Sequence, residues 1–352
     1  MSKARGYAAL KPAAPLVPFS FDRREPGDMD VRIEIAYCGI CHSDLHQVRD
    51  EWSEGLFPMV PGHEIAGRVT QVGRKVRKFK VGDLAGVGCL VDSCRKCPSC
   101  RRGEEQFCDG PLSFTYNGTE RDRKTPTYGG YSSHVVVDEA FALKVRAGQP
   151  LERVAPLLCA GITTYSPLKR HGAGKGRRVG VLGLGGLGHM AVKIAAAMGA
   201  EVTVLSGTAS KKTDARRLGA HDFALTSDPK TAARMAGRLD LIVDTVSGPH
   251  DVNAALGMLG VGGTLALVGA SPKPLEIGAF PLIARRRAVA GSLIGGIAQT
   301  QEMLDFCARN KVLADVEVIP ASGINAAYER MLKSDVRYRF SIDLKTLPGE
   351  EC

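Results

Sequence analysis

A glycine pattern places the strongest constraint on the fold of this chain. In the segment VGVLGLGGLGHMAVKIAAAMGAEVTVLS, Gly183, Gly185 and Gly188 have the spacing G-x-G-x-x-G, after an apolar run and before a helix pattern. These glycines permit a tight turn and a close approach of the backbone to a pyrophosphate at the helix N-terminus. A second apolar run, 201–205, follows at the distance of the next parallel strand. The pattern predicts a dinucleotide site that includes Gly186 and Leu187.

The residues after this second run indicate which dinucleotide binds. At the position where an acidic residue would bind the adenosine ribose diol, the chain has Ser206, followed by Gly207, Thr208 and, further on, Lys211. Because this segment has no carboxylate, nothing in it would repel a 2′-phosphate. Its hydroxyl groups and lysine can bind one. The sequence therefore predicts NADP(H) rather than NAD(H).

Four clustered cysteines form a C-x2-C-x2-C-x7-C pattern in VDSCRKCPSCRRGEEQFCDG. They are Cys94, Cys97, Cys100 and Cys108. Four thiolates at this spacing can surround one zinc ion and leave no open position, as in a structural zinc site. An iron–sulfur cluster could use the same ligands, but the hydride chemistry that the dinucleotide pattern indicates needs no such cluster.

A second, open metal site is predicted from residues that lie far apart in the sequence. The segment CGICHSDLH holds Cys41 and His42, PGHE holds His63 and Glu64, and LLCAGITTY holds Cys159. Two thiolates and one imidazole leave a fourth position for water or substrate, as a catalytic zinc site requires.

The pattern of predicted secondary structure changes near the middle of the chain. The first part alternates short β-rich runs, among them 31–37, 65–72 and 133–137, with Gly and Pro; from about residue 178, apolar runs alternate with helix-length segments. Such alternation predicts βαβ units with a parallel sheet covered on both faces. Helices at 300–309 and 324–333 and a strand at 340–344 end the chain. We expect an α/β protein with domains at 1–153, including a metal lobe at about 89–112, then 154–295 and 296–352.

Composition limits the location and the partners. The 352 residues include ten cysteines and carry a net charge of +10, and we find neither a membrane-spanning apolar run nor the apolar core of a signal peptide. We therefore expect a cytoplasmic protein, in which cysteines serve metals, catalysis or burial rather than disulfides.

Together these segments resemble the zinc-dependent medium-chain alcohol dehydrogenases, and within them the cinnamyl alcohol dehydrogenase-like branch with its NADPH-dependent aldehyde reductases. The similarity covers nearly the whole chain, including CGICHSDLHQVRDEW, PGHEIAGRV and GLGGLGHMAVKIA. It implies a GroES-like catalytic domain, a doubly wound Rossmann domain, two zinc ions per chain, and hydride transfer between NADP(H) and an aldehyde or a primary alcohol, aliphatic or aromatic. It also implies a homodimer through residues 288–295, although a tetramer is not excluded.

The resemblance assigns roles to individual residues. Cys41, His63 and Cys159 match the ligands of the catalytic zinc, and Asp44 matches a carboxylate that orients the zinc-bound His63. Glu64 matches a carboxylate that can take the vacant zinc position or assist water exchange.

Further matches concern the proton, the cofactor and the substrate. Ser43 and His46 match a proton relay from the substrate oxygen to solvent. His42 matches a position near the cofactor pyrophosphate, and Thr163 one near the nicotinamide. The expected substrate-pocket residues are Trp52, Leu90, Phe114, Leu293 and Ile294. Phe114 stands where plant lignin-pathway members often have Trp, so a strict preference for bulky cinnamyl aldehydes does not follow.

Two other functions are weighed against this one. A zinc polyol dehydrogenase would share the scaffold, but its third ligand is usually Glu where this chain has Cys159. A zinc-stabilised nucleic-acid-binding protein would suit the positive charge, yet the sequence offers no recognition helix and no aromatic platform for bases. We expect neither nucleic acid nor membrane as a partner, and the roles of Cys38, Cys89, Cys307 and Cys352 stay open.

Overall fold

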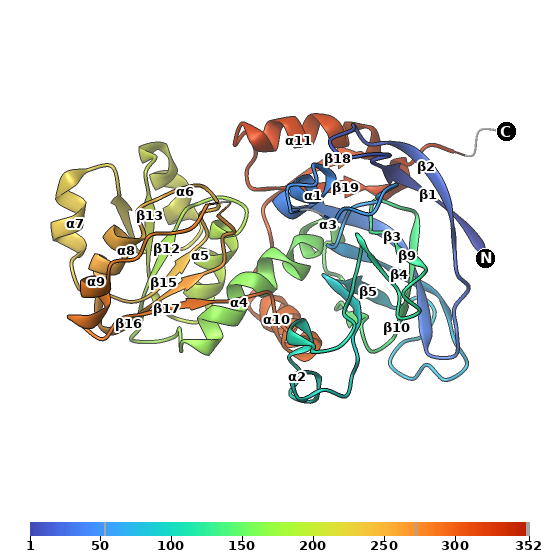
Figure 1. Ribbon diagram of the computed structural model, residues 1–352, viewed down its shortest axis with the longest axis horizontal. Coiled ribbons are helices and arrows are strands. Elements are labelled where there is room, and N and C mark those ends of the chain that lie inside the picture. The colour runs from blue at the N-terminus through green and yellow to red at the C-terminus, as the bar shows by residue number, and fades with distance from the viewer. Residues whose placement is uncertain (53, 272, 350–352) are drawn as a thin grey trace. The chain divides into compact units, whose positions relative to one another are not determined.

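Two compact units make up the chain in the computed structural model, which describes residues 1–52, 54–271 and 273–349 (Figure 1). One, here called the β unit, consists of residues 1–159, 295–308 and 313–352, and the other, the α/β unit, of residues 160–294 and 309–312. The domain limits expected from the sequence stay predictions, and Cys352 lies outside the described residues. No described helix is both long and apolar enough to cross a lipid bilayer.

The net charge is divided very unequally between the units. Residues of the α/β unit include 19 Lys and Arg against eight Asp and Glu, whereas the β unit has 28 against 29. The whole positive excess therefore belongs to the unit with the glycine pattern.

The main sheet of the β unit is arranged around β3 (Asp30–Ile40), which pairs antiparallel with β4 (Ile65–Val72), β10 (His134–Asp138) and β19 (Arg339–Asp343). Its strand order is β11-β5-β4-β3-β19-β18, with β10 also on β3. Apolar side chains alternate along these strands and pack into one core, where Ile33, Ile65 and Phe340 are fully buried.

Shorter elements complete the β unit. The remaining strands are β1 (Ser2–Ala8), β2 (Val17–Arg23), β5 (Leu84–Val87), β6 (Leu90–Asp92), β7 (Ser113–Phe114), β8 (Gly118–Thr119), β9 (Pro126–Thr127), β11 (Leu143–Lys144) and β18 (Val316–Pro320). The helices are α1 (His42–Val48), α2 (Pro98–Arg101), η1 (Glu105–Phe107), α3 (Leu151–Val154), η2 (Ala155–Leu158), η4 (Ala321–Gly323), α11 (Ile324–Leu332) and η5 (Leu344–Thr346), with α10 (Ile297–Asn310) near the end of the chain.

A buried histidine links β10 to the N-terminal strand. The imidazole of His134 lies 3.1 Å from the hydroxyls of both Ser2 and Ser133, and its residue is only 3% exposed. Burial, with a smaller contribution from Arg32 and Arg23, lowers the pKa of His134 to about 4. The neutral imidazole is therefore the form that this part of the fold accommodates.

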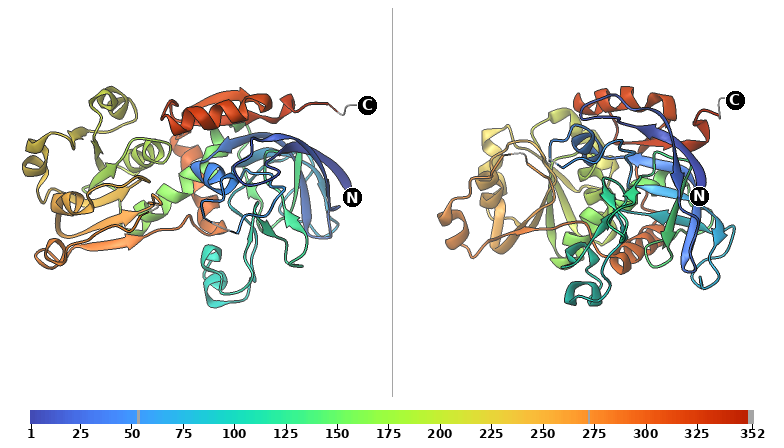
Figure 2. Two further views of the ribbon diagram at one scale, coloured as in Figure 1. Left: turned by 45° about the horizontal axis from the view of Figure 1, so that its top comes forward. Right: turned by 45° about the vertical axis from the view of Figure 1, so that its right-hand side comes forward.

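A parallel sheet with the order β14-β13-β12-β15-β16-β17 forms the α/β unit. Its strands are β12 (Arg178–Leu182), β13 (Glu201–Ser206), β14 (Asp222–Leu225), β15 (Leu239–Asp244), β16 (Leu259–Leu267) and β17 (Ala288–Gly291). Its helices are α4 (Ala160–Arg170), α5 (Gly188–Ala197), η3 (Ala209–Lys211), α6 (Lys212–Arg217), α7 (Pro229–Met235), α8 (Val252–Met258) and α9 (Ala279–Ile283). They flank the sheet on both faces (Figure 2), and the expected doubly wound fold is confirmed.

Candidate active site and metal centres

Four potential metal ligands of the β unit converge beside the ends of β3 and β4. Cys41 follows β3 as the N-cap of α1, His63 and Glu64 precede β4, and Cys159 follows η2. Their ligand atoms lie within 4.8 Å of one another, and all four residues are buried. Two sulfurs, one imidazole and a carboxylate are a donor set that zinc accepts with tetrahedral geometry.

The turn that presents His63 depends on a glycine. Gly62 has φ of +104°, and a Cβ atom there would meet the ring of Tyr131 at 2.6 Å and the sulfur of Cys38 at 2.8 Å. A larger residue would be strained and would clash, so the Pro-Gly pair noted in the sequence is needed to place His63 and Glu64.

Asp44 holds the imidazole of His63 in one orientation. Its Oδ1 lies 3.0 Å from Nδ1 of His63 and accepts a hydrogen bond from the N–H of Gly62 at 3.2 Å, while its Oδ2 accepts one from the N–H of Cys41 at 2.9 Å. When Nδ1 donates to a carboxylate, Nε2 keeps its lone pair for a metal. The ring of Tyr116 stacks on His63, with ring centres 5.7 Å apart.

The electrostatics of the two thiols favour a cation between them. The sulfurs of Cys41 and Cys159 are 3.9 Å apart. The hydrogen bond from Cys159 lowers the pKa of Cys41 well below its usual value, and the same hydrogen bond raises the pKa of Cys159 well above it. Two thiolates at this distance repel each other, so both ionise only when a positive ion lies beside them.

Glu64 forms a buried ion pair that the sequence did not suggest. Its Oε1 accepts a hydrogen bond from the guanidinium of Arg339 on β19, although the residues are 275 positions apart. Burial raises the pKa of Glu64 to about 7 despite this partner. Its Oε2 is buried without a hydrogen-bond partner among the described residues. A zinc ion or its bound water is a chemically suitable partner for that oxygen.

The residues expected to relay a proton lie along α1. The hydroxyl of Ser43 is 3.6 Å from the sulfur of Cys41, and His46 follows one turn later. Nδ1 of His46 lies 2.5 Å from a carboxylate oxygen of Glu51, and its ring stacks on Trp52 at 5.0 Å. Sequence reasoning missed Glu51, for which the only signal was an acidic residue just after the helix.

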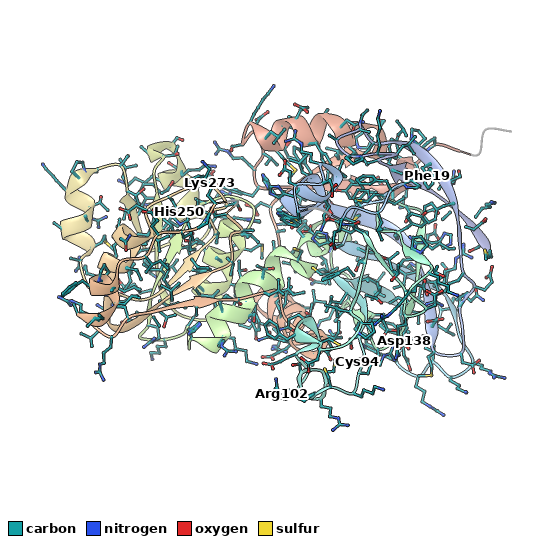
Figure 3. All side chains as sticks on the ribbon, viewed as in Figure 1. Phe19, Cys94, Arg102, Asp138, His250 and Lys273 are labelled. Carbon is teal, nitrogen blue, oxygen red and sulfur yellow. The ribbon has the colours of Figure 1, made fainter. Side chains whose placement is uncertain are left out.

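The four-cysteine pattern forms a separate lobe. The ligand atoms of Cys94, Cys97, Cys100 and Cys108 lie within 4.8 Å of one another (Figure 3, where Cys94 is labelled). Backbone N–H groups point at the sulfurs, as from Cys97 to Cys94 at 3.3 Å and from Cys94 to Cys108 at 3.3 Å. N–H groups of Lys96 and Cys97 lower the pKa of Cys94 to about 6. Such donors stabilise thiolates, so the lobe fits a closed zinc site.

Two of the cysteines without an expected role, Cys89 and Cys38, lie beside the catalytic cluster. A hydrogen bond with Cys159 lowers the pKa of Cys89, and His63 and Cys41 also affect it. Cys38 and Cys307 are buried, with the Cys307 sulfur 3.7 Å from that of Met303. No sequence pattern indicated the position of Cys89, because its contact with Cys159 depends on how distant segments pack.

The glycine pattern of the α/β unit forms the expected turn between β12 and α5. Gly183 has φ of +88°, and a Cβ atom on Gly188 would lie 2.1 Å from the carbonyl oxygen of Gly183. A Cβ atom on Gly185 would meet nothing within 4 Å, so open space lies beside this backbone. Gly186 accepts a hydrogen bond from His189 at 2.8 Å, and Leu187 is the N-cap of α5. The turn fits a dinucleotide pyrophosphate.

The expected 2′-phosphate residues lie together at the carboxyl end of β13. Ser206 ends the strand and its Oγ accepts a hydrogen bond from the N–H of Thr208 at 3.2 Å. Gly207 lies between them, and Lys211 ends the short helix η3. This segment carries no carboxylate.

The remaining expected site residues are placed as follows. Leu90 is buried and pairs with Phe114 between β6 and β7, while Phe114 and Trp52 are each 46% exposed. Thr163 is buried in α4, His42 is exposed in α1, and Leu293 and Ile294 follow β17. Their contacts with cofactor or substrate stay predictions.

Comparisons with known proteins agree with this architecture. Residues 27–147 match the family model "Alcohol dehydrogenase GroES-like domain", and residues 186–309 match "Zinc-binding dehydrogenase". The NADP-dependent alcohol dehydrogenase C 1 of Mycolicibacterium smegmatis is 54% identical over 348 residues, 99% of each chain. The mannitol dehydrogenase of Petroselinum crispum is 55% identical over 331 residues, 94% of this chain and 98% of its own. A cinnamyl alcohol dehydrogenase structure from Sorghum bicolor has a TM-score of 0.96 at 45% identity and covers 100% of both chains.

The chain therefore belongs to the zinc-dependent medium-chain alcohol dehydrogenases, in their cinnamyl alcohol dehydrogenase-like, NADP-dependent branch. The predictions of family, fold class, enzyme class and cofactors, two zinc ions and NADP(H), are confirmed. Membership of this family favours the enzyme over the alternative of a nucleic-acid-binding protein.

Proposed function

We propose that this NADP-dependent zinc alcohol dehydrogenase interconverts primary alcohols and aldehydes of broad aliphatic or aromatic type. The observation that carries the proposal is the buried cluster of Cys41, His63 and Cys159, with Asp44 behind His63. Zinc held by these residues would supply a Lewis acid for the substrate oxygen. NADP(H) would donate or accept the hydride at the carbonyl carbon.

The cluster can be tested by metal analysis. The purified enzyme should contain two zinc ions per chain, and Cys41→Ser should retain one and lose turnover. A Cys307→Ser variant is a matched control, because Cys307 is buried far along the chain beside Met303. A Cys41→Ser protein with two zinc ions and full turnover would remove Cys41 from the ligand set.

For the proton we propose a path from Ser43 to His46 and on to Glu51. The Ser43 hydroxyl lies beside the Cys41 sulfur, and the 2.5 Å contact of His46 leads to Glu51, whose side chain is 42% exposed. A basic group at His46 can take the proton released by an alcohol or return it to an alkoxide. His46→Gln should slow turnover most at neutral and lower pH; an unchanged pH profile would count against the path.

The cofactor preference is proposed to depend on Ser206, Thr208 and Lys211. Two hydroxyl groups and an ammonium group at the end of β13 suit a 2′-phosphate. We expect catalytic efficiency with NADPH to exceed that with NADH by at least about tenfold, or roughly 1.4 kcal/mol. Equal efficiency with both cofactors would refute this assignment.

The substrate is proposed to be an aldehyde of broad type, with a polyol as the second candidate. The 55% identity to a protein named mannitol dehydrogenase favours the polyol candidate. The apolar side chains proposed as substrate-pocket residues, Leu90, Phe114 and Leu293, favour an aldehyde with an apolar tail. Catalytic efficiencies for aliphatic and aromatic aldehydes with NADPH, measured beside mannitol with NADP+, would separate the two.

We further propose a cytoplasmic homodimer formed through the α/β units. The nine described cysteines are free thiols, which suits a reducing compartment. Strand β17 is at an edge of the sheet, and nearby Phe280 and Ile283 on α9 are 81% and 70% exposed. Exposed edges and apolar patches commonly pair with a partner. Light scattering should give twice the chain mass, and Ile283→Lys should halve it; a wild-type monomer would refute the dimer.

A further inference from the structure

Asp44 is a fully buried carboxylate with an unusual supply of donors. Hydrogen bonds from Cys41, Gly62 and His63 come from the segments that carry the proposed zinc ligands. A further hydrogen bond comes from the hydroxyl of Tyr131, which donates to Oδ2 of Asp44 at 3.0 Å. A buried carboxylate is stable as an anion only when such donors replace water.

Tyr131 is itself held in place by main-chain contacts. Its N–H donates to the carbonyl of Pro61 at 2.9 Å, and its carbonyl accepts from the N–H of Tyr7 at 2.9 Å. Its ring lies against Gly62, and the residue is 0% exposed. The hydroxyl therefore has little freedom to move away from Asp44.

Tyr328 of α11 lies behind Tyr131. The hydroxyl of Tyr328 donates to that of Tyr131 at 3.4 Å. The helix is anchored one turn earlier, where the side chain of Asn325 exchanges two hydrogen bonds of 2.9 Å with the backbone of Leu16. Burial raises the pKa of both tyrosines well above the usual value, so both hydroxyls remain donors.

We propose that Tyr131, supported by Tyr328, is a positioning residue for the catalytic zinc: its hydroxyl fixes the Asp44 carboxylate against His63 and thereby slows the loss of the metal. The proposal rests on the proposed ligand set of Cys41, His63 and Cys159. It adds a chain of hydroxyl groups that runs from α11 through Tyr131 and Asp44 to the imidazole.

The physical reason is the cost of removing one of the two donors from a buried carboxylate oxygen. Without the Tyr131 hydroxyl, Oδ2 of Asp44 keeps only the N–H of Cys41 as a donor, and the carboxylate is held less firmly against His63. His63 is then held less firmly and is a weaker ligand. Loss of an outer partner of a metal-bound histidine typically costs about 10- to 100-fold in metal affinity.

The test measures zinc release from the holoenzyme, with a colorimetric chelator as the probe. The four-cysteine lobe provides an internal reference, because its ligands form a cluster separate from that of His63. Tyr131→Phe keeps the ring and removes the hydroxyl, and should release the catalytic zinc about tenfold faster while the structural zinc leaves at the wild-type rate. Tyr328→Phe should have a smaller effect on the same zinc ion.

A matched control is Tyr7→Phe, which removes a hydroxyl from another buried tyrosine, one that makes no hydrogen bond to Asp44 in the part of the chain that the structure describes. It should release both zinc ions at wild-type rates. As a second readout, cobalt placed in the catalytic site should show altered absorption bands in Tyr131→Phe, because these bands depend on ligand geometry.

The outcomes distinguish this proposal from the one it rests on. Selective acceleration at the catalytic site supports the role of Tyr131. Unchanged release in Tyr131→Phe, or equal acceleration at both sites, overturns it while leaving the ligand set intact. Retention of two zinc ions by Cys41→Ser overturns the ligand set and this proposal with it.

Discussion

Protonation of His134 should destabilise the fold below neutral pH. The residue is 3% exposed, and its pKa is about 4 in the folded chain compared with 6.5 for the unfolded reference. Because the folded pKa is the lower one, the unfolded chain binds more protons between these values, and stability falls as the pH falls through this window. The full stability is present above pH 6.5.

The size of the effect follows from the two pKa values. At pH 5 the expected loss relative to neutral pH is about 2 kcal/mol, and it approaches about 3.4 kcal/mol below pH 4. His134→Gln provides the reference, because glutamine can hydrogen-bond with Ser2 and Ser133 but does not titrate. Subtracting the pH-dependent change in the free energy of unfolding of His134→Gln from that of the wild type removes the contribution of every other titrating group.

The assay is urea-induced unfolding of wild type and His134→Gln at pH 7, 6 and 5 with zinc present. The wild type should lose about 2 kcal/mol more than the variant between pH 7 and pH 5. If both proteins lose the same stability between pH 7 and pH 5, protonation of His134 does not couple folding to pH, and the prediction is wrong.

Three further predictions concern the cofactor, the proton path and the core. Ser206→Asp places a carboxylate where a 2′-phosphate is proposed to bind, and should lower catalytic efficiency with NADPH by at least about tenfold while sparing NADH, as steady-state kinetics would show. Glu51→Gln should lower turnover through the weaker contact with His46, by less than His46→Gln does; equal rates for wild type and Glu51→Gln would exclude Glu51 from the path. Ile242→Ala opens a cavity at a 0% exposed position of β15, and should cost about 2–5 kcal/mol in urea unfolding.

The features that the sequence predicted best are those formed by residues close together in the chain. The glycine turn and the four-cysteine lobe each lie within a short segment, so the spacing of residues nearly determines which atoms can meet. The strand Ile65–Val72 has the bounds expected from its apolar run. In these cases local geometry leaves few alternatives.

Contacts between distant segments could not be predicted from the sequence. Arg339 reaches Glu64 across 275 positions, and Tyr328 reaches Tyr131 across 197. No sequence pattern predicts the hydrogen-bond partner of a single arginine or tyrosine in a strand or helix. The partner depends on how the whole sheet packs. Long-range polar contacts of this kind become visible only once the fold is known.

The uneven distribution of charge has a kinetic consequence. A unit with 19 basic and eight acidic side chains produces a positive potential that extends about 10 Å into solution at 0.1 M salt. An anionic dinucleotide diffusing nearby is drawn toward this unit before it makes any contact, so its association rate should fall steeply with ionic strength while its dissociation rate changes little. Stopped-flow fluorescence of NADPH binding at several salt concentrations measures both rates. The basic excess would then act as a long-range guide for the cofactor, and the nearly neutral β unit would leave the capture of uncharged alcohols and aldehydes independent of salt.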